Sequence, residues 1–199
     1  MKQVALPLGL ALIPLAWGVS RFGMTGHMTA HMLSVAVAAP LVAVGLRGSM
    51  LDPAARWPQR VTPMAMMLLE LATVWGWHLP ALRRASATFT SVALVEQACF
   101  LVAGWLLWSA ALGNVHRASG IGALLLTSMH MTLLGVLVGL SPRPLYPMAQ
   151  PHAAPFGLDP VIDQQLGGAV MLAIGAISYL AGGLALLSGL LTTDGEDAT

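Results

Sequence analysis

Six apolar segments dominate this sequence, and each approaches or exceeds the length of a membrane-spanning helix. A helix needs about 20 largely apolar residues to cross the hydrocarbon core of a bilayer. The segments cover approximately residues 4–18, 24–46, 61–79, 88–112, 118–140 and 165–191. Hydrophobic residues make up 57% of the chain and charged residues 9%, a composition that soluble globular domains do not have. We therefore predict an all-α protein, a polytopic transmembrane helical bundle of about six helices.

The length of the chain limits it to one domain. Its 199 residues leave no room for a sizeable soluble domain once the helices are counted, so residues 1–199 are predicted to form a single integral membrane domain. The first apolar segment resembles a signal peptide, but no small-x-small cleavage site precedes Ser20, and we interpret it as an uncleaved helix. Pro40 is expected to kink the second helix, and the acidic residues 192–199 are expected to form a solvated tail.

Basic residues are divided almost evenly between the two ends of a six-helix bundle. One end would carry Lys2, Arg47, Arg56, Arg60 and Arg117, and the other Arg21, Arg83, Arg84 and Arg143. The positive-inside rule then gives only weak evidence for the orientation of the bundle in the membrane. The basic loop at 47–60 nevertheless favours cytoplasmic termini. The net charge of +1 gives no indication of nucleic-acid binding, and a single cysteine, Cys99, excludes a disulfide framework or a paired-thiol metal motif.

The segment MTGHMTAHM places two imidazoles and three thioethers on one face of the second helix. At about 100° per residue, the arc that holds them is roughly 140° wide. These residues are Met24, His27, Met28, His31 and Met32. Histidines spaced i, i+4 can bind one metal ion from a single helix, and thioether sulfurs favour Cu(I) over harder ions. The alternative is a methionine-lined packing seam, although the cost of histidine at membrane depth favours a functional role.

Other polar residues are expected at the same end of the bundle, because an even number of crossings brings their helix ends together. His78, at the end of the third helix, is either an interfacial residue or a further ligand. Tyr146 follows the fifth helix and is a candidate interface anchor. Asp163 and Gln164 begin the sixth helix, where Asp163 either caps that helix or has a functional role. Such an asymmetric arrangement indicates a site that is open to one compartment.

Ionisable residues also lie deeper in the predicted helices. Glu70 and His130 fall near the middles of the third and fifth helices, and Glu96 lies about 13 Å along the fourth helix from the site end. Intramembrane ionisable groups are functional candidates. A Glu70–His130 pair would lower the cost of burying both groups, and it would serve either the site or an interhelical hydrogen bond. His116 and His152 are expected at the surface.

Four motifs occur in order between the second and the sixth helix. They are MTGHMTAHMLSVAVAAPLVAVG at 24–45, WHLPAL at 77–82, PLYP at 144–147 and DQQLGGAVM at 163–171. Together they resemble the CtaG-type cytochrome c oxidase assembly factors, a family of integral membrane proteins associated with maturation of the copper-containing subunit of terminal oxidases. The resemblance implies a role near copper B insertion. The residues that match family motif positions are His27, Met28, His31, Met32, His78, Tyr146, Asp163 and Gln164.

The chain departs from the family pattern at the fourth helix. Where such proteins often show H-x-x-E-H-x-x-F, this sequence reads ALVEQACF at 93–100, so Glu96 and Phe100 remain and both histidines are absent. Arg83-Arg84 also replaces the Tyr-Asp that commonly follows WHLPAL, and no tryptophan follows Met171. A metal site in this protein would therefore be reduced or altered. Cys99 is either a partial substitute or inert packing.

These residues lead to a copper hypothesis, and the family resemblance implies that the protein lies in the bacterial inner membrane. Cu(I) from the periplasm, supplied by a periplasmic donor, would be held by His27, His31 and Met28, with Met24 or His78. It would then pass laterally to the catalytic subunit of a terminal oxidase. Imidazole and thioether ligands bind Cu(I) without releasing protons at neutral pH. No activated nucleophile, phosphate loop or nucleotide motif occurs, so we do not predict an enzyme.

Two other classes of function remain open. One is a small b-type cytochrome, with His31 or His78 and His130 as axial haem ligands. The other is a scaffold or accessory subunit of the oxidase that binds no metal, which the missing histidines favour. A copper transporter is disfavoured because the opposite end of the bundle offers no matching ligands.

Overall fold

The computed structural model describes residues 2–113, 117–146 and 157–196, and all regular structure in these residues is helical. The elements are α1 Lys2–Val19, α2 Gly23–Met32, the π-helical turn η1 Leu33–Ala38, α3 Ala39–Leu46, α4 Pro53–Arg56, α5 Pro63–Trp77, α6 Pro80–Thr88, α7 Thr90–Ala111, α8 Arg117–Gly139 and α9 Pro160–Glu196. The predicted all-α helical bundle is confirmed. His116 and His152 lie outside the described residues.

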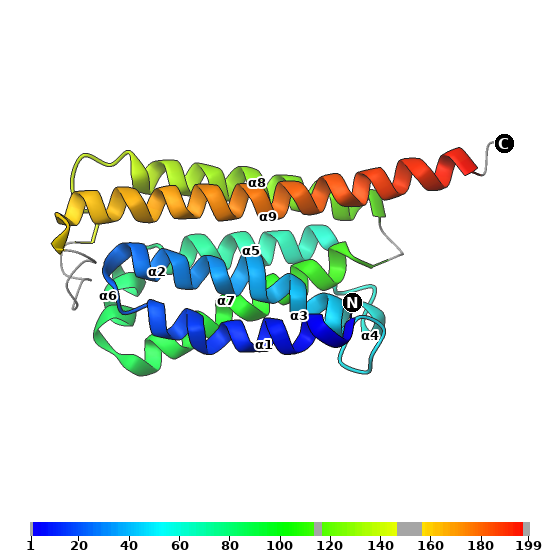
Figure 1. Ribbon diagram of the computed structural model, residues 1–199, viewed down its shortest axis with the longest axis horizontal. Helices are drawn as coiled ribbons and strands as arrows, with labels where there is room; N and C mark the ends of the chain where they lie inside the picture. Colours follow the sequence, from blue (N-terminus) through cyan, green and yellow to red (C-terminus); the bar gives the residue numbers. More distant parts are fainter. Residues whose placement is uncertain (1, 114–116, 147–156, 197–199) are drawn as a thin grey trace.

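Five helical stretches are long and apolar enough to cross a membrane. They are Lys2–Val19, Gly23–Leu46, Thr90–Ala111, Arg117–Gly139 and Pro160–Leu191. The remaining predicted span forms α5, whose 15 residues extend only about 22 Å. It still lies parallel to the others, so α1 begins and α9 ends at the same end of the bundle (Figure 1). The chain is therefore a multi-pass membrane protein.

Two helix boundaries differ from those predicted. The short helix α6 lies apart from α7, and Phe89 between them adopts an extended conformation, so the long helix begins only at Thr90. The last helix begins at Pro160 and continues through Glu196 into the segment expected to be a tail. Pro160 is well suited to the first helical position, and the Val161 N–H donates to Asp159 Oδ1 at 2.8 Å, which caps the helix.

The helices form closely packed pairs. In Figure 1, α8 and α9 lie side by side along one edge of the bundle, and α1 forms the opposite edge. A Cβ atom at Gly168 would lie 2.6 Å from Gly139 Cα, and one at Gly182 would lie 2.5 Å from Trp108 Cη2. No larger residue fits at these two positions. Small residues therefore determine how closely α9 approaches α8 and α7.

The irregularity expected at Pro40 is the π-helical turn η1, in which the Ala39 N–H donates to Ser34 O. Proline has no N–H, so it cannot donate to a carbonyl in the preceding turn. The structure satisfies two of these carbonyls from α9: Ser178 Oγ donates to Ala36 O at 2.5 Å, and Tyr179 Oη donates to Val35 O at 3.3 Å. Within a bilayer no water is present to do so, which explains why α9 carries hydroxyl groups at this depth.

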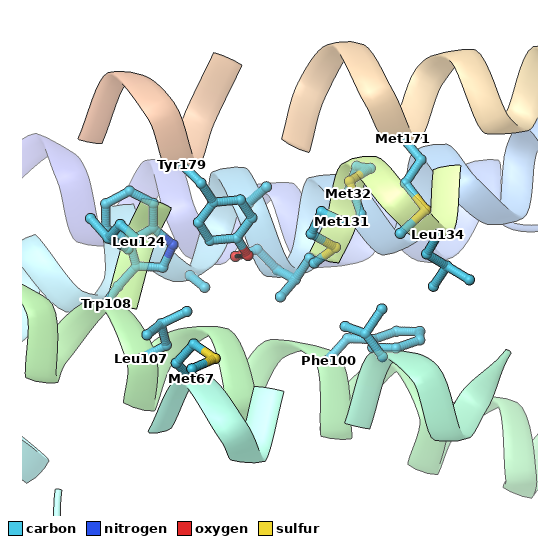
Figure 2. Packing of buried hydrophobic residues seen from close by; sticks show 14 of the residues in the cluster. Met32, Met67, Phe100, Leu107, Trp108, Leu124, Met131, Leu134, Met171 and Tyr179 are labelled. Carbon is cyan, nitrogen blue, oxygen red and sulfur yellow. Dashed lines mark hydrogen bonds between the residues drawn. The ribbon is translucent and has the colours of Figure 1, made fainter. Parts of the chain in front are cut away.

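The core of the bundle is rich in methionine, whereas many leucines face outward. Five methionines are almost completely buried: Met24, Met28, Met32, Met131 and Met171. Figure 2 shows Met32, Met131 and Met171 on the inner faces of α2, α8 and α9, with Phe100 and Tyr179 nearby. Flexible thioethers fill irregular gaps well. The methionines of α2 therefore serve at least as core residues.

Candidate metal centre

The first turn of α2 is held by Asp163, which lies on α9. The Met24 N–H donates to Asp163 Oδ2 at 2.6 Å and the Thr25 N–H to Oδ1 at 3.0 Å, while Thr25 Oγ1 donates to Asp163 O at 2.9 Å. The first N–H groups of a helix have no partner within it, and a carboxylate is favourable at that end. Asp163 thus caps α2 from a neighbouring helix, whereas Asp159 is the residue that caps α9.

Gln164 and Tyr146 hold the segment that follows α8. Gln164 Oε1 accepts from the Leu145 N–H at 2.7 Å, and Gln164 Nε2 donates to Val138 O at 3.1 Å. Tyr146 Oη donates to His78 O at 2.8 Å. Tyr146 is buried rather than an exposed interface anchor, and burial raises the pKa of its phenol while the positive charge of Arg83 lowers it. The tyrosine therefore positions the backbone of His78.

Three histidines meet at this end of the bundle, which we call the site end: the starts of α2, α7 and α9 and the ends of α5 and α8. The ring centroids of His31 and His78 are 5.3 Å apart, and those of His27 and His78 are 6.4 Å apart. All three side chains are buried. The end of α5 thus places His78 beside the histidine pair of α2, as the crossing pattern predicts.

Each of these rings has at least one nitrogen atom with no hydrogen-bond partner, and in His27 that atom is Nε2. His78 Nδ1 lies 2.6 Å from Val74 O, and because a carbonyl only accepts, Nδ1 carries the proton and Nε2 keeps its lone pair. Neither His78 Nε2 nor either nitrogen of His31 has a partner in the described structure. The His31 ring stacks on Phe100 with centroids 3.9 Å apart. Buried unpaired nitrogens are costly, and a soft metal ion fits such donors.

His27 has an acidic neighbour. Its Nε2 lies 3.7 Å from Glu96 Oε1, and both side chains are buried. Glu96 is six residues beyond the start of α7, about 9 Å along the helix and nearer the site end than predicted, because α7 begins at Thr90. His27 thus has a carboxylate within 4 Å, although its Nε2 lacks a hydrogen-bond partner, as do nitrogen atoms of His31 and His78.

The methionines and the histidines of α2 contact different neighbouring helices. A Cβ atom at Gly167 would lie 3.1 Å from Met28 Cγ and 3.3 Å from Met24 Cγ, and one at Gly175 would lie 3.7 Å from Met32 Sδ. The methionines therefore pack on α9, whereas the histidines meet α5 and α7. The predicted stripe thus has a histidine edge and a methionine edge rather than one common focus.

The two positions of α7 at which the family pattern has histidine face a cavity. Ala93 and Gln97 line a cavity of about 340 Å³ together with His27 and Glu96, and Gln97 Oε1 accepts from Ser34 Oγ at 3.1 Å. Cys99 is half-buried. Among the described residues, no group of three or more His, Cys, Asp or Glu side chains is arranged to hold a metal ion. A bound ion would therefore need thioether ligands or a ligand from another molecule.

Glu70 and His130 form the predicted pair, separate from the three histidines. Glu70 Oε2 lies 2.9 Å from His130 Nε2, and Tyr179 Oη donates to Glu70 Oε1 at 3.3 Å. Tyr179 also stacks on Trp108, with ring centroids 5.6 Å apart. The pair joins α5, α8 and α9 in the interior, so His130 belongs to this network.

Comparison with known families gives a match. The family model described as cytochrome c oxidase caa3 assembly factor matches residues 5–193. The chain belongs to this family. The match covers every candidate residue named above and confirms the resemblance that the four motifs indicate. No curated protein and no solved structure matches the chain.

In this cytochrome c oxidase assembly factor, the side chain that the sequence analysis missed is Arg83. It is 7% exposed, and its Nη1 donates to Ser86 Oγ at 2.8 Å. Burial lowers the pKa of the guanidinium, while Glu96 and Tyr146 raise it. In the sequence, Arg83 is one of two consecutive arginines after the WHLPAL motif, and nothing distinguishes the buried one from the exposed one.

Proposed function

We propose that this assembly factor binds Cu(I) as its cargo at His31 and His78 and assists its insertion at copper B of the oxidase catalytic subunit. One observation carries the proposal. Two buried imidazoles from different helices lie 5.3 Å apart, and both present ring nitrogens without hydrogen-bond partners. Soft, neutral donors of this kind favour Cu(I).

The surrounding residues would orient these ligands. Val74 O holds the tautomer of His78, Tyr146 holds its backbone, and Phe100 supports the ring of His31. Such indirect contacts fix ligand orientation at metal sites. His27, Met24, Met28 and Met32 are the further donors nearest to the pair along α2.

The incomplete ligand set supports transfer rather than storage. Two imidazoles leave a Cu(I) ion open to a ligand from a donor or an acceptor protein, so the ion would move by ligand exchange. We place the site end at the periplasmic face of the bacterial inner membrane, where a periplasmic copper donor would supply it. The role is non-catalytic, because ligand exchange breaks no covalent bond of a substrate.

The test is an anaerobic Cu(I) titration of the purified protein. We expect stoichiometric binding by wild type and its loss in His31→Asn/His78→Asn. The matched control is His130→Asn, which changes a buried histidine of the Glu70 network and should retain binding. Thermal unfolding of each variant checks folding, and absence of binding by the wild type would overturn the proposal.

A metal-free scaffold is the second candidate. The observation that favours it is the absence, among the described side chains, of a complete set of His, Cys, Asp or Glu ligands. Co-purification of an intact oxidase from copper-depleted cells, unchanged by His31→Asn/His78→Asn, would support it. The haem alternative is weaker, because His130 Nε2 already lies 2.9 Å from Glu70. An absorption spectrum of the same samples tests for haem.

A further inference from the structure

The 340 Å³ cavity at the site end has a strongly polar wall beyond the candidate ligands. It lies between the end of α1, the helix α6 and the start of α7. Trp17, Ser20 and Arg21 line it from α1 and the turn that follows, and Arg83, Ser86 and Thr88 line it from α6. Neither His31 nor His78 is among its lining residues, although His27 is.

Arg83 is the unusual member of this wall. Its side chain is 93% buried, and its only hydrogen bond in the described structure joins Nη1 to Ser86 Oγ. Its buried Nε has no hydrogen-bond partner. No carboxylate among the described residues lies within 4 Å of its nitrogen atoms. Glu96, which lines the same cavity, acts on Arg83 at longer range. A buried guanidinium that contacts no carboxylate and whose Nε has no acceptor is costly, so Arg83 has donor capacity left for an anion in the cavity.

The charges of the cavity agree with this conclusion. Arg21 and Arg83 line it, and Glu96 is the one carboxylate among its lining residues. Arginine recognises phosphate oxygens through several parallel hydrogen bonds.

The position of the cavity identifies the source of the anion. One membrane-spanning helix ends and another begins beside it, which is the level of the lipid headgroups. Trp17 is a typical interfacial residue. Phe22 and Phe89, which are 55% and 59% exposed, lie in the segments on either side. A headgroup phosphate from the adjacent leaflet therefore reaches this cavity more readily than a soluble ion does.

We propose that the cavity binds the phosphodiester group of an anionic phospholipid, with Arg83 as the buried anchor. Arg21 adds a second positive charge. The lipid would join α1 to α6 and α7 at the site end. The proposal is independent of copper binding, since its ligands are other residues.

The test uses delipidated protein in a non-ionic detergent, with bound lipids counted by native mass spectrometry and unfolding followed thermally. We expect one phosphatidylglycerol to bind and to raise the melting temperature, whereas phosphatidylcholine does neither. Arg83→Gln should weaken phosphatidylglycerol binding at least about tenfold, because it removes a charge-assisted contact. The matched control is Arg84→Gln, since the neighbouring arginine is exposed and donates only to Pro80 O at 3.2 Å.

Arg21→Gln provides a second variant, because Arg21 is exposed and its replacement should not affect folding. It should weaken phosphatidylglycerol binding less than Arg83→Gln. Equal binding of both lipids would overturn the proposal, and so would equal losses in Arg83→Gln and Arg84→Gln. The same stabilisation by inorganic phosphate alone would show a free anion site and overturn the lipid assignment.

Discussion

Asp163, in the first turn of α9, accepts a 2.6 Å hydrogen bond from the backbone N–H of Met24 at the start of α2. The two residues are 139 positions apart in the chain, and both are buried. This contact fixes the position of α2 along the axis of α9. It therefore determines where His27 and His31 lie relative to His78, which reaches the same end from α5.

Replacing Asp163 by alanine should destabilise the protein by about 2 kcal/mol, because two N–H groups of α2 lose a charged acceptor. Denaturant or thermal unfolding in detergent measures the change. Asp159→Ala is the matched control, since Asp159 caps α9 with an exposed side chain and should cost about half as much. Equal losses of stability from the two substitutions would show that the contact between α2 and α9 contributes no more than a local helix cap does.

Tyr146→Phe removes the hydroxyl that holds His78 O but keeps the ring. We expect a loss of about 1 kcal/mol in stability. If the proposed copper site is correct, Cu(I) affinity should also fall by about tenfold, because an orienting contact is lost. Competition with a Cu(I) chelator measures the affinity.

The other tyrosine of the chain supplies the control. Tyr179 Oη shares its one proton between Glu70 Oε1 and Val35 O, each 3.3 Å away, and forms no hydrogen bond with His78 in the described structure. Tyr179→Phe should therefore lower stability and leave Cu(I) affinity unchanged. A loss of affinity in Tyr179→Phe as large as that in Tyr146→Phe would mean that the effect is one of general stability.

Much of the fold is predictable from the sequence because lipid imposes simple rules. Long apolar runs mark the helices. Because the chain reverses direction at each crossing, the start of the second helix and the ends of the third and fifth helices lie at the same end of the bundle. The spacing of His27 and His31 likewise predicts a shared, buried face. The Glu70–His130 pair is predictable because each group is too costly to bury alone.

The remaining features depend on tertiary contacts that have no local pattern. The angular position of Met28 on α2 does not show which helix it will face, and in the structure that helix is α9. Asp163 looks like a cap for its own helix because capping signals are read locally. Arg83 and Arg84 are adjacent, and only the rotation of α6 buries one of them.

The Glu70–His130 pair should show strong coupling. Glu70→Leu should destabilise the protein by about 3 kcal/mol or more, since it breaks a buried pair and leaves His130 without its partner. Glu70→Leu/His130→Leu removes both polar groups and should cost less than the sum of the two single substitutions. Unfolding of the four proteins completes the cycle, and additive costs would contradict an interaction between the two side chains.

The π-helical turn offers a second coupled pair, between Pro40 and Ser178. Ser178→Ala should destabilise the protein by about 1–2 kcal/mol, because Ala36 O loses its donor in a region without water. Pro40→Ala restores a backbone N–H that can serve a carbonyl of the preceding turn. The double variant should therefore be more stable than the sum of the single effects predicts. A double-mutant cycle by thermal unfolding measures this, and additivity would show that Ser178 does not compensate for the proline.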